Sequence, residues 1–279
     1  MIIHLFRNFA IRFLNVLFSF WKNRFLIIQL ISRELGRRYR GSFLGILWTL
    51  ITPLATLIIY TFVFSVVLKA RWSNGPGQDS NLSYALILFA GYIPFNVFME
   101  VVNSSPTIIL SNPNYVKKVV FPIEILPVIS LGTAVINSMF SLVVLVVGML
   151  ILGSPISFTF LLFPLAFVPL LLIIIGLSWF LASLGVFIRD LDQAIRIITQ
   201  VIMFLTPIFY PFEMVPQDFK AIISANPFTF IVTSFRQLIL WQQVFSFEEW
   251  SFWTFIGLVI AILGFVWFQK SRKGFSDVM

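Results

Sequence analysis

Few side chains in this sequence have the type and spacing that catalysis needs. Asp190 and Asp192 form the one paired-acid candidate for general acid–base chemistry, and they have no histidine partner. The single histidine is His4, and the sequence contains no cysteine, so thiol nucleophiles, disulfides and thiolate metal sites are excluded. The default interpretation is a structural turn in which the two acids form local ion pairs with Arg196, and the alternative is a contact with a partner. The sequence therefore favours a protein that is not an enzyme.

Basic side chains, in contrast, are concentrated at one end of the chain. The sequence has 19 Lys and Arg against 11 acids, for a net charge of +8. Eight of these cations precede Gly41, whereas residues 42–68 carry no charge: Arg7, Arg12, Lys22, Arg24, Arg33, Arg37, Arg38 and Arg40. Cations next to an apolar stretch are typical of the cytoplasmic end of a membrane span.

Residues 22–40 have the periodicity of an amphipathic helix. One face carries Phe25, Ile28, Ser32, Leu35 and Tyr39, and the other carries Lys22, Gln29, Arg33, Arg37 and Arg40. Such a helix lies in the membrane interface, with arginine toward headgroups or a partner protein. It is either a simple surface anchor or a docking surface that also guards a lateral entrance. The candidate entrance residues are Arg33, Arg37, Arg38, Tyr39 and Arg40.

The elements that must position these residues are transmembrane helices. The chain is 59 % hydrophobic and 11 % charged, against about 25 % charged in a soluble domain. About 20 apolar residues cross a bilayer, and six such spans are predicted at 43–68, 82–99, 125–152, 156–188, 197–212 and 252–268. A tight turn at 153–155 separates the third from the fourth. The expected architecture is an all-α integral membrane protein forming one domain over 1–279, with a cytoplasmic lead-in (1–40), a six-span bundle (43–268) and a cytoplasmic tail (269–279).

Charge bias orients these spans. With six crossings, fifteen of the 19 Lys and Arg residues fall on the side of the two termini, which predicts that both termini are cytoplasmic. The 40 residues from Tyr210 to Trp250 then lie outside, yet they are too apolar for a free loop. They predict two short helices, either a re-entrant hairpin acting as an exit gate or a pair lying on the outer leaflet.

The spans carry no ionisable residue that we place at the membrane midplane, which disfavours an ion-coupled carrier. The sequence also lacks the G-x-x-x-x-G-K-[ST] phosphate loop. Active transport would therefore draw its energy from a partner at the cytoplasmic face. There, the loop between the second and third spans begins with a turn at Asn112-Pro113 and carries Lys117 and Lys118. It is either an ordinary basic loop or a docking element.

Aromatic residues make up 17 % of the chain. Aromatic faces offer flat apolar surface to the C–H faces of sugars, so some of them are candidates to line a channel: Tyr60, Phe62, Phe64, Phe89, Tyr92, Phe95, Phe204 and Phe209. Small residues at Gly41 and Gly45, and at Gly257 and Ala261, have the spacing of close helix packing. A six-span bundle is small for a large solute, which favours a dimer.

Several stretches resemble one family in order along the chain. They are Arg38-Tyr-Arg-Gly-Ser-Phe-Leu-Gly-Ile-Leu-Trp48, Val116-Lys-Lys-Val-Val-Phe-Pro-Ile-Glu-Ile-Leu-Pro127, Leu184-Gly-Val-Phe-Ile-Arg-Asp-Leu-Asp-Gln193, Thr206-Pro-Ile-Phe-Tyr-Pro211, Asn226-Pro227 and Arg272-Lys-Gly-Phe-Ser-Asp277. Together they are similar to ABC-2-type permeases, the transmembrane subunits of exporters of O-antigen, capsule and teichoic acid. The resemblance covers roughly residues 25–279.

This resemblance implies a homodimer with two cytoplasmic ABC ATPase subunits, which bind Mg-ATP, so that the chain itself holds no cofactor. It implies that Asn112, Tyr115, Lys117 and Lys118 couple to the ATPase, and that Arg189 and Asp190 belong to a structural loop. The substrate would be a lipid-linked polysaccharide on an undecaprenyl-type carrier, in a bacterial inner membrane, with no nucleic acid involved. The alternatives are export of teichoic acid, capsule or a small lipid or drug, and an integral-membrane glycan transferase.

Overall fold

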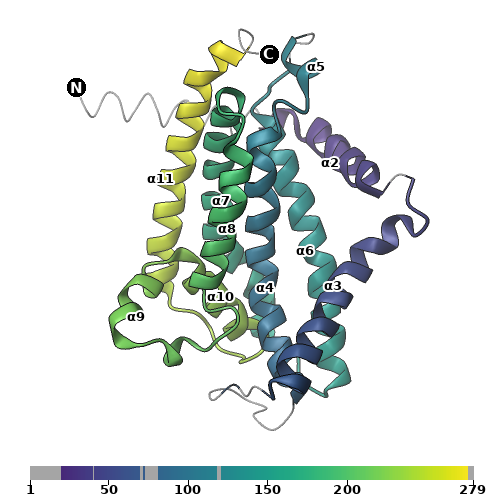
Figure 1. Ribbon diagram of the computed structural model, residues 1–279, viewed down its shortest axis with the longest axis vertical. Helices are drawn as coiled ribbons and strands as arrows, with labels where there is room; N and C mark the ends of the chain where they lie inside the picture. Colours follow the sequence, from purple (N-terminus) through teal and green to yellow (C-terminus); the bar gives the residue numbers. More distant parts are fainter. Residues whose placement is uncertain (1–19, 40, 70–71, 73–80, 118–120, 276–279) are drawn as a thin grey trace.

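The computed structural model describes residues 20–39, 41–69, 72, 81–117 and 121–275. Every regular element within those ranges is a helix, and the long helices run side by side as one bundle (Figure 1). The prediction of an all-α membrane protein is therefore confirmed. His4, Arg40 and Lys118 lie outside the described residues.

Among the described residues, five helices are long and apolar enough to cross a membrane. They are α3 (Trp48–Tyr60) with the 3₁₀ helix η1 (Gly45–Leu47) before it and the π-helix η2 (Thr61–Val67) after it, α4 (Asn81–Ser104), α6 (Ile125–Ile151), α7 (Phe163–Phe187) preceded by η4 (Phe158–Leu162), and α11 (Phe247–Ser271). They correspond to the first four predicted spans and the sixth. Gly153, with a φ of +69°, makes the predicted tight turn after α6.

The predicted fifth span, 197–212, is not confirmed. In its place α8 (Leu191–Leu205) has 15 residues, so it is about 22 Å long and shorter than the roughly 30 Å hydrocarbon core. The helix ends because Thr206 precedes Pro207 and is extended. One face of α8 is buried at Ile195 and Thr199, while its other apolar face is exposed.

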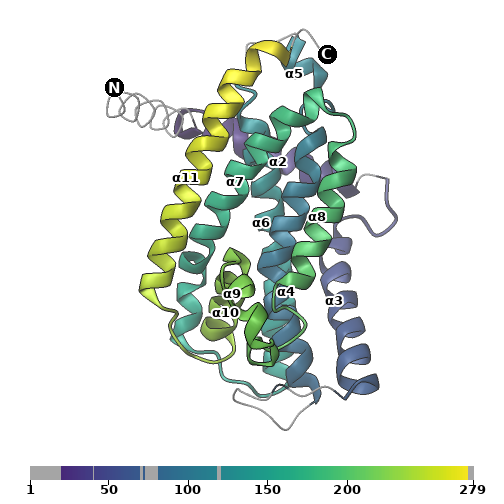
Figure 2. The same ribbon diagram turned by 60° about the vertical axis from the view of Figure 1, so that its left-hand side comes forward.

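Two short helices follow, as predicted: α9 (Gln217–Ser224) and α10 (Pro227–Ile239). The side chain of Asn226 caps α10 by accepting a hydrogen bond from the Phe228 backbone N–H at 3.0 Å. Figures 1 and 2 show both helices at the end of the bundle opposite α2. α10 is buried against α4 and α7, whereas α9 is largely exposed. α10 is therefore part of the bundle core.

The predicted amphipathic helix is α2 (Arg24–Tyr39), which lies obliquely across the other end of the bundle (Figure 1). Phe25 and Ile28 on its predicted apolar face stay exposed. A second apolar face, not identified from the sequence, packs on the bundle core through Leu26, Ile27, Leu30 and Ile31. Ile31 fills the space beside Gly132 of α6, where a Cβ would overlap it. α2 is therefore held by packing as well as by its charges.

Of the two pairs of small residues predicted to allow close helix packing, only the second lies at a helix contact. Gly41 and Gly45 have positive φ values of +85° and +51°, and a Cβ at either would meet nothing within 4 Å. They are turn residues between α2 and α3, so the prediction of close packing there is wrong. Gly257 does pack closely, since a Cβ would lie 3.0 Å from the Cβ of Leu172. On the same face of α11, a Cβ at Gly264 would overlap the Gly176 carbonyl, so α7 and α11 meet backbone to backbone.

Candidate functional site at the α2 end of the bundle

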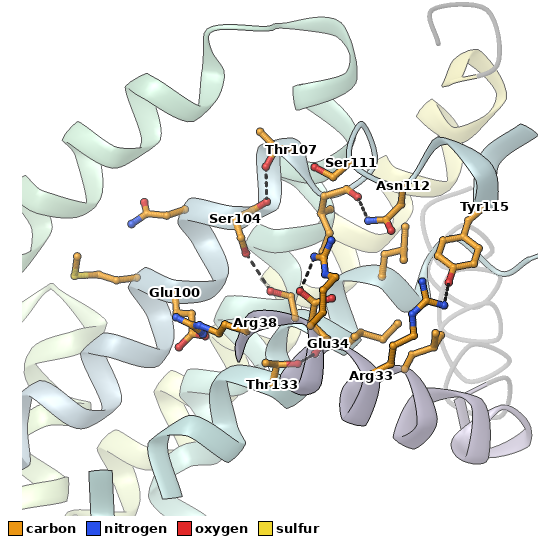
Figure 3. A pocket seen from close by; sticks show the side chains of 18 of the residues that line it. Arg33, Glu34, Arg38, Glu100, Ser104, Thr107, Ser111, Asn112, Tyr115 and Thr133 are labelled. Atoms are coloured by element: carbon orange, nitrogen blue, oxygen red, sulfur yellow. Dashed lines mark hydrogen bonds and ion pairs between the residues drawn. The ribbon is translucent and has the colours of Figure 1, made fainter. Parts of the chain in front are cut away.

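A cavity of about 890 Å³ lies between α2, α4, α6 and the segment leading into α5 (Pro113–Lys117). Figure 3 shows side chains from these elements converging on it. Its charged lining residues are Arg33, Glu34, Arg37, Arg38, Glu100 and Arg196. Because arginines outnumber glutamates in this set, the cavity offers an anionic group a net positive surface within an otherwise apolar bundle.

The cavity joins two sets of residues that the sequence analysis treated separately. Arg33 of α2 donates a hydrogen bond to the Tyr115 hydroxyl of α5 at 3.3 Å (Figure 3). The Asn112 amide donates to the Ile108 carbonyl at 2.8 Å, which fixes the turn before α5. The Tyr115 ring stacks on Phe121 with centroids 4.4 Å apart. The candidate entrance and the candidate coupling loop are thus in direct contact.

Of the other predicted residues here, Arg37 donates to Glu34 within α2 at 2.7 Å. This hydrogen bond raises the pKa of Arg37 above its ordinary value. Both side chains are exposed, so the pair contributes little to folding stability. Tyr39 and Lys117 are the last residues of α2 and α5.

Arg38 pairs with Glu100, a residue that the sequence analysis placed in a loop. α4 continues to Ser104, five residues beyond the predicted end of the second span, so Glu100 lies within a membrane-spanning helix. It also accepts a hydrogen bond from the Asn137 amide of α6 at 2.8 Å. The sequence analysis placed no ionisable residue at the membrane midplane, and Glu100 does not contradict this, because it lies only four residues before the end of α4 and on the side of α2. Carboxylates in membrane-spanning helices are costly to bury and mark functional sites.

A polar stripe that the sequence analysis did not identify could have pointed to this site. Asn96, Glu100, Asn103 and Ser104 lie at helical spacing on one side of α4, and Thr107 follows in the 3₁₀ turn η3 (Ser105–Thr107). All five line the cavity. An apolar helix with such a stripe is expected to turn it toward protein or water rather than toward lipid.

A second cavity of about 410 Å³ lies along α3, α4 and α6. It shares Arg38, Thr52, Asn96 and Glu100 with the first cavity, so the Arg38–Glu100 pair stands where the two meet. Tyr92 lines it too, and the Tyr92 hydroxyl donates to the Asn96 side-chain oxygen at 3.0 Å.

Five of the eight candidate channel aromatics form one connected cluster. Tyr60 contacts Phe64, Tyr92 and Phe209, with ring centroids 5.7–6.1 Å apart, and Phe204 contacts Phe209 at 6.1 Å. The other three lie elsewhere. Phe62 is 60 % exposed, Phe89 is fully buried in the core, and Phe95 is fully buried beside Phe98 and Phe228. Because Tyr92 also lines the smaller cavity, the cluster continues from it toward the far end.

At that far end lies a buried cation that the sequence analysis counted as an external loop charge. Arg236 of α10 is 2 % exposed. Its Nε, Nη1 and Nη2 donate to the carbonyls of Ile87, Pro207 and Ile208 at 2.7–2.9 Å. Its guanidinium lies 4.7 Å from the ring centroid of Trp72. Arg236 therefore holds the non-helical segment that follows α8.

Arg189 and Asp190 lie in the turn between α7 and α8, and the Asp190 carbonyl accepts a hydrogen bond from the Ala194 N–H at 3.3 Å. The ion pairs within 4 Å among the described residues are Arg37–Glu34, Arg38–Glu100 and Arg272–Glu124. Local pairs from Asp190 and Asp192 are not among them, so that expectation is wrong. The described residues also contain no group of three His, Cys, Asp or Glu placed to hold a metal ion.

Comparison with known proteins places this architecture in a family. Residues 26–240 match the family model described as ABC-2 type transporter. The O-antigen export system permease protein RfbA of Myxococcus xanthus is 27 % identical over 260 residues, which cover 92 % of this chain and 96 % of that protein. RfbA of Klebsiella pneumoniae is 26 % identical over 255 residues, covering 91 % and 95 %. The polysialic acid transport protein KpsM of Escherichia coli is 23 % identical over 249 residues, covering 88 % and 92 %. The chain belongs to the ABC-2 type transporter family.

Proposed function

We propose that this chain is the transmembrane subunit of an ATP-driven exporter that moves a lipid-linked polysaccharide from the cytoplasmic to the outer face of a bacterial inner membrane. The observation that carries the proposal is the arginine-lined cavity of about 890 Å³ at the α2 end of an apolar bundle. Such a cavity suits the diphosphate of a lipid carrier, because guanidinium groups bind phosphate oxygens in a bidentate manner. The names of the similar permeases support a polysaccharide cargo.

The energy source in this proposal is a separate ABC ATPase, with two copies bound to a homodimer of the chain and Mg-ATP held by the ATPase alone. The sequence supports this because it has no phosphate loop of its own. The contact between Arg33 and Tyr115 supports α2 and α5 as the docking surface, since it ties both to the same end of the bundle. The exposed apolar residues of α3, including Leu54 and Ile58, support a surface covered by lipid or by the second copy.

Export is tested by deleting the gene in the source cell and complementing it with the wild-type chain or with Arg38→Ala. We expect surface polysaccharide to disappear in the deletion strain while polysaccharide accumulates inside the cell, measured by periodate staining of surface extracts and cell lysates. Arg38→Ala should reproduce the defect while the protein still purifies with its ATPase. Unchanged surface polysaccharide after deletion would contradict the proposed function.

The cytoplasmic position of the α2 end is tested by cysteine labelling, since the chain has no cysteine of its own. In spheroplasts, a membrane-impermeant maleimide should label Lys220→Cys on α9 without permeabilisation. Arg189→Cys, in the turn after α7, should be labelled only after the membrane is opened. The reverse pattern would contradict the proposed orientation.

Docking of the ATPase is tested by charge reversal of the coupling loop. Lys117→Glu combined with Lys118→Glu should weaken co-purification with the ATPase encoded beside the permease, or uncouple ATP hydrolysis from export. Lys270→Glu combined with Lys273→Glu, at the end of α11 and in the 3₁₀ turn after it, is the matched charge change outside this loop. Normal assembly and export in the double variant would contradict the docking assignment.

A further inference from the structure

The smaller cavity has a different chemistry from the larger one. Its volume of about 410 Å³ lies in the range of cavities that hold small ligands. Hydroxyls and amides from three helices line it: Thr49, Thr52 and Thr56 of α3, Asn96 of α4, and Asn137 and Ser141 of α6. Arg38 is the one cation in its lining, against four arginines around the larger cavity. The larger cavity is therefore suited to an anion, and the smaller one to an uncharged polar group.

Two oxygens in this lining have acceptor capacity to spare. Glu100 accepts from both Arg38 and Asn137 through the same atom, Oε1, so within the described residues its Oε2 accepts no hydrogen bond. The Asn137 side-chain oxygen is buried and has no hydrogen-bond partner in the described part of the chain. The buried Asn137 oxygen left without a partner costs about 1–3 kcal/mol. A ligand carrying hydroxyl donors would satisfy it and could also donate to Oε2 of Glu100, whose side chain is 20 % exposed.

Aromatic rings border the same cavity. Trp48 lines it, and its indole N–H donates to the Ser42 hydroxyl at 3.0 Å, which fixes the ring. Tyr92 lines it from α4, fixed by its hydrogen bond to Asn96. Oriented aromatic faces beside spare acceptors match a molecule that has both C–H faces and hydroxyl groups, which is the chemistry of a sugar ring.

We propose that the smaller cavity is a sugar-binding subsite, in which Glu100 and Asn137 accept hydrogen bonds from the hydroxyls of the sugar next to the carrier's diphosphate. This inference rests on the proposed export of a lipid-linked polysaccharide. The diphosphate binds among the arginines of the larger cavity, and the first sugar reaches past Arg38 into the smaller one. Glu100 and Asn137 then select glycans by their first sugar.

The test compares carrier lipids with and without a sugar. The purified permease–ATPase complex in lipid nanodiscs is titrated with undecaprenyl diphosphate and with the same lipid carrying N-acetylglucosamine, glucose or galactose, and dissociation constants are measured by native mass spectrometry. We expect at least one sugar-bearing lipid to bind about tenfold more tightly than undecaprenyl diphosphate, as expected for hydrogen bonds to a charged acceptor.

Two substitutions examine the acceptors separately. Glu100→Gln keeps the shape but removes the charge, and Asn137→Leu removes the amide. Each should bring the sugar preference close to onefold. Asn137 lines only the smaller cavity, so Asn137→Leu should leave the affinity for undecaprenyl diphosphate within about twofold, which also reports that the variant is folded. Glu100 borders both cavities, so Glu100→Gln should strengthen the binding of all four lipids while removing the preference among them. Glu248→Gln, an exposed acid in the first turn of α11, is the matched control and should keep the full preference.

Equal wild-type affinity for all four lipids would overturn the subsite and leave a cavity filled by water only. A preference that survives both substitutions would also overturn it. Either result, with export intact in cells, refutes the subsite alone. Undisturbed surface polysaccharide in the deletion strain refutes the proposed export function instead.

Discussion

The two ends of the bundle handle charge in opposite ways. At the α2 end, the side chains of Arg38 and Glu100 remain 48 % and 20 % exposed and border two cavities. At the far end, Arg236 is 2 % exposed and donates from three nitrogens to backbone carbonyls. A charge pair beside a cavity can exchange its partner for a ligand, whereas an arginine fixed to the backbone cannot do so without breaking the fold. The far end uses its charge to hold its own chain in place, whereas the α2 end leaves its charge pair accessible from two cavities.

Among the substitutions that test this comparison, Arg236→Leu is expected to reduce stability the most. The substitution leaves the carbonyls of Pro207 and Ile208, in the non-helical segment after α8, without their donor, at about 1–3 kcal/mol each. It also removes the hydrogen bond to the Ile87 carbonyl of α4. We expect a loss of stability of about 3 kcal/mol or more, measured as a lower unfolding temperature of the purified protein in detergent. Burial lowers the pKa of Arg236 to about 9, which still leaves it charged at neutral pH.

The matched control is Arg189→Leu, the same change at an exposed residue in the turn after α7. It should alter stability by about 0.5 kcal/mol or less. If the two variants unfold at the same temperature, Arg236 is not a structural anchor and the comparison between the ends fails.

A somewhat smaller effect is expected for Gly91→Ala on α4. The added Cβ would lie 2.5 Å from Nη2 of Arg236, and that guanidinium has no room to move because three carbonyls hold it. Overpacking of this kind costs about 1–3 kcal/mol. Gly36→Ala on α2 is the control, since a Cβ there meets nothing within 4 Å. Alanine also favours a helix over glycine, so the control should be neutral or slightly stabilising in the same unfolding assay.

Glu100→Gln should affect stability less than either change at the far end. The amide oxygen still accepts a hydrogen bond, and Arg38 is partly exposed to water, so we expect a loss of about 1 kcal/mol or less. Surface polysaccharide should nevertheless fall clearly in the complementation assay. A variant that unfolds as readily as Arg236→Leu would show that Glu100 is structural rather than part of a binding site.

The smallest effect on stability is expected for Tyr115→Phe. The substitution keeps the ring stacked on Phe121 and removes only an exposed hydrogen bond to Arg33, worth about 0.5 kcal/mol. Its consequence should appear in coupling, as a lower ratio of glycan exported to ATP hydrolysed in reconstituted vesicles. An unchanged ratio would limit the Arg33–Tyr115 contact to a structural role.

Much of the fold could be predicted because lipid imposes strict rules on sequence. Uninterrupted apolar stretches predicted the first, third and fourth spans closely, and α6 begins and ends within one residue of its predicted bounds. The fifth span was misjudged because Pro207 stops α8 early, and the apolar residues beyond it belong to a non-helical segment and to α9 and α10. Hydropathy alone does not distinguish residues buried in protein from residues in lipid.

The site could be predicted only in part. The arginines of α2 and the loop at Asn112 were identified from local pattern, and the structure brings them together. Glu100 and Arg236 were missed because each was assigned to a loop. Only tertiary packing gives Glu100 its partners on α2 and α6, and Arg236 its partners on α4 and in the segment after α8. Ring contacts likewise depend on which face of a helix meets its neighbour, so Phe62 and Phe89 were grouped with a cluster to which they do not belong.

The glycine contacts between α7 and α11 have a mechanical consequence. Gly176 and Gly264 leave no space for even a methyl group between the two backbones. Two helices in such contact cannot rotate against each other or separate by a small amount without losing most of their packing. α7 and α11 therefore form the rigid part of the bundle. A route for a glycan would have to widen by movement of the helices on the other side of the bundle. There, α3 is largely exposed and is linked to α2 through turns at Gly41 and Gly45.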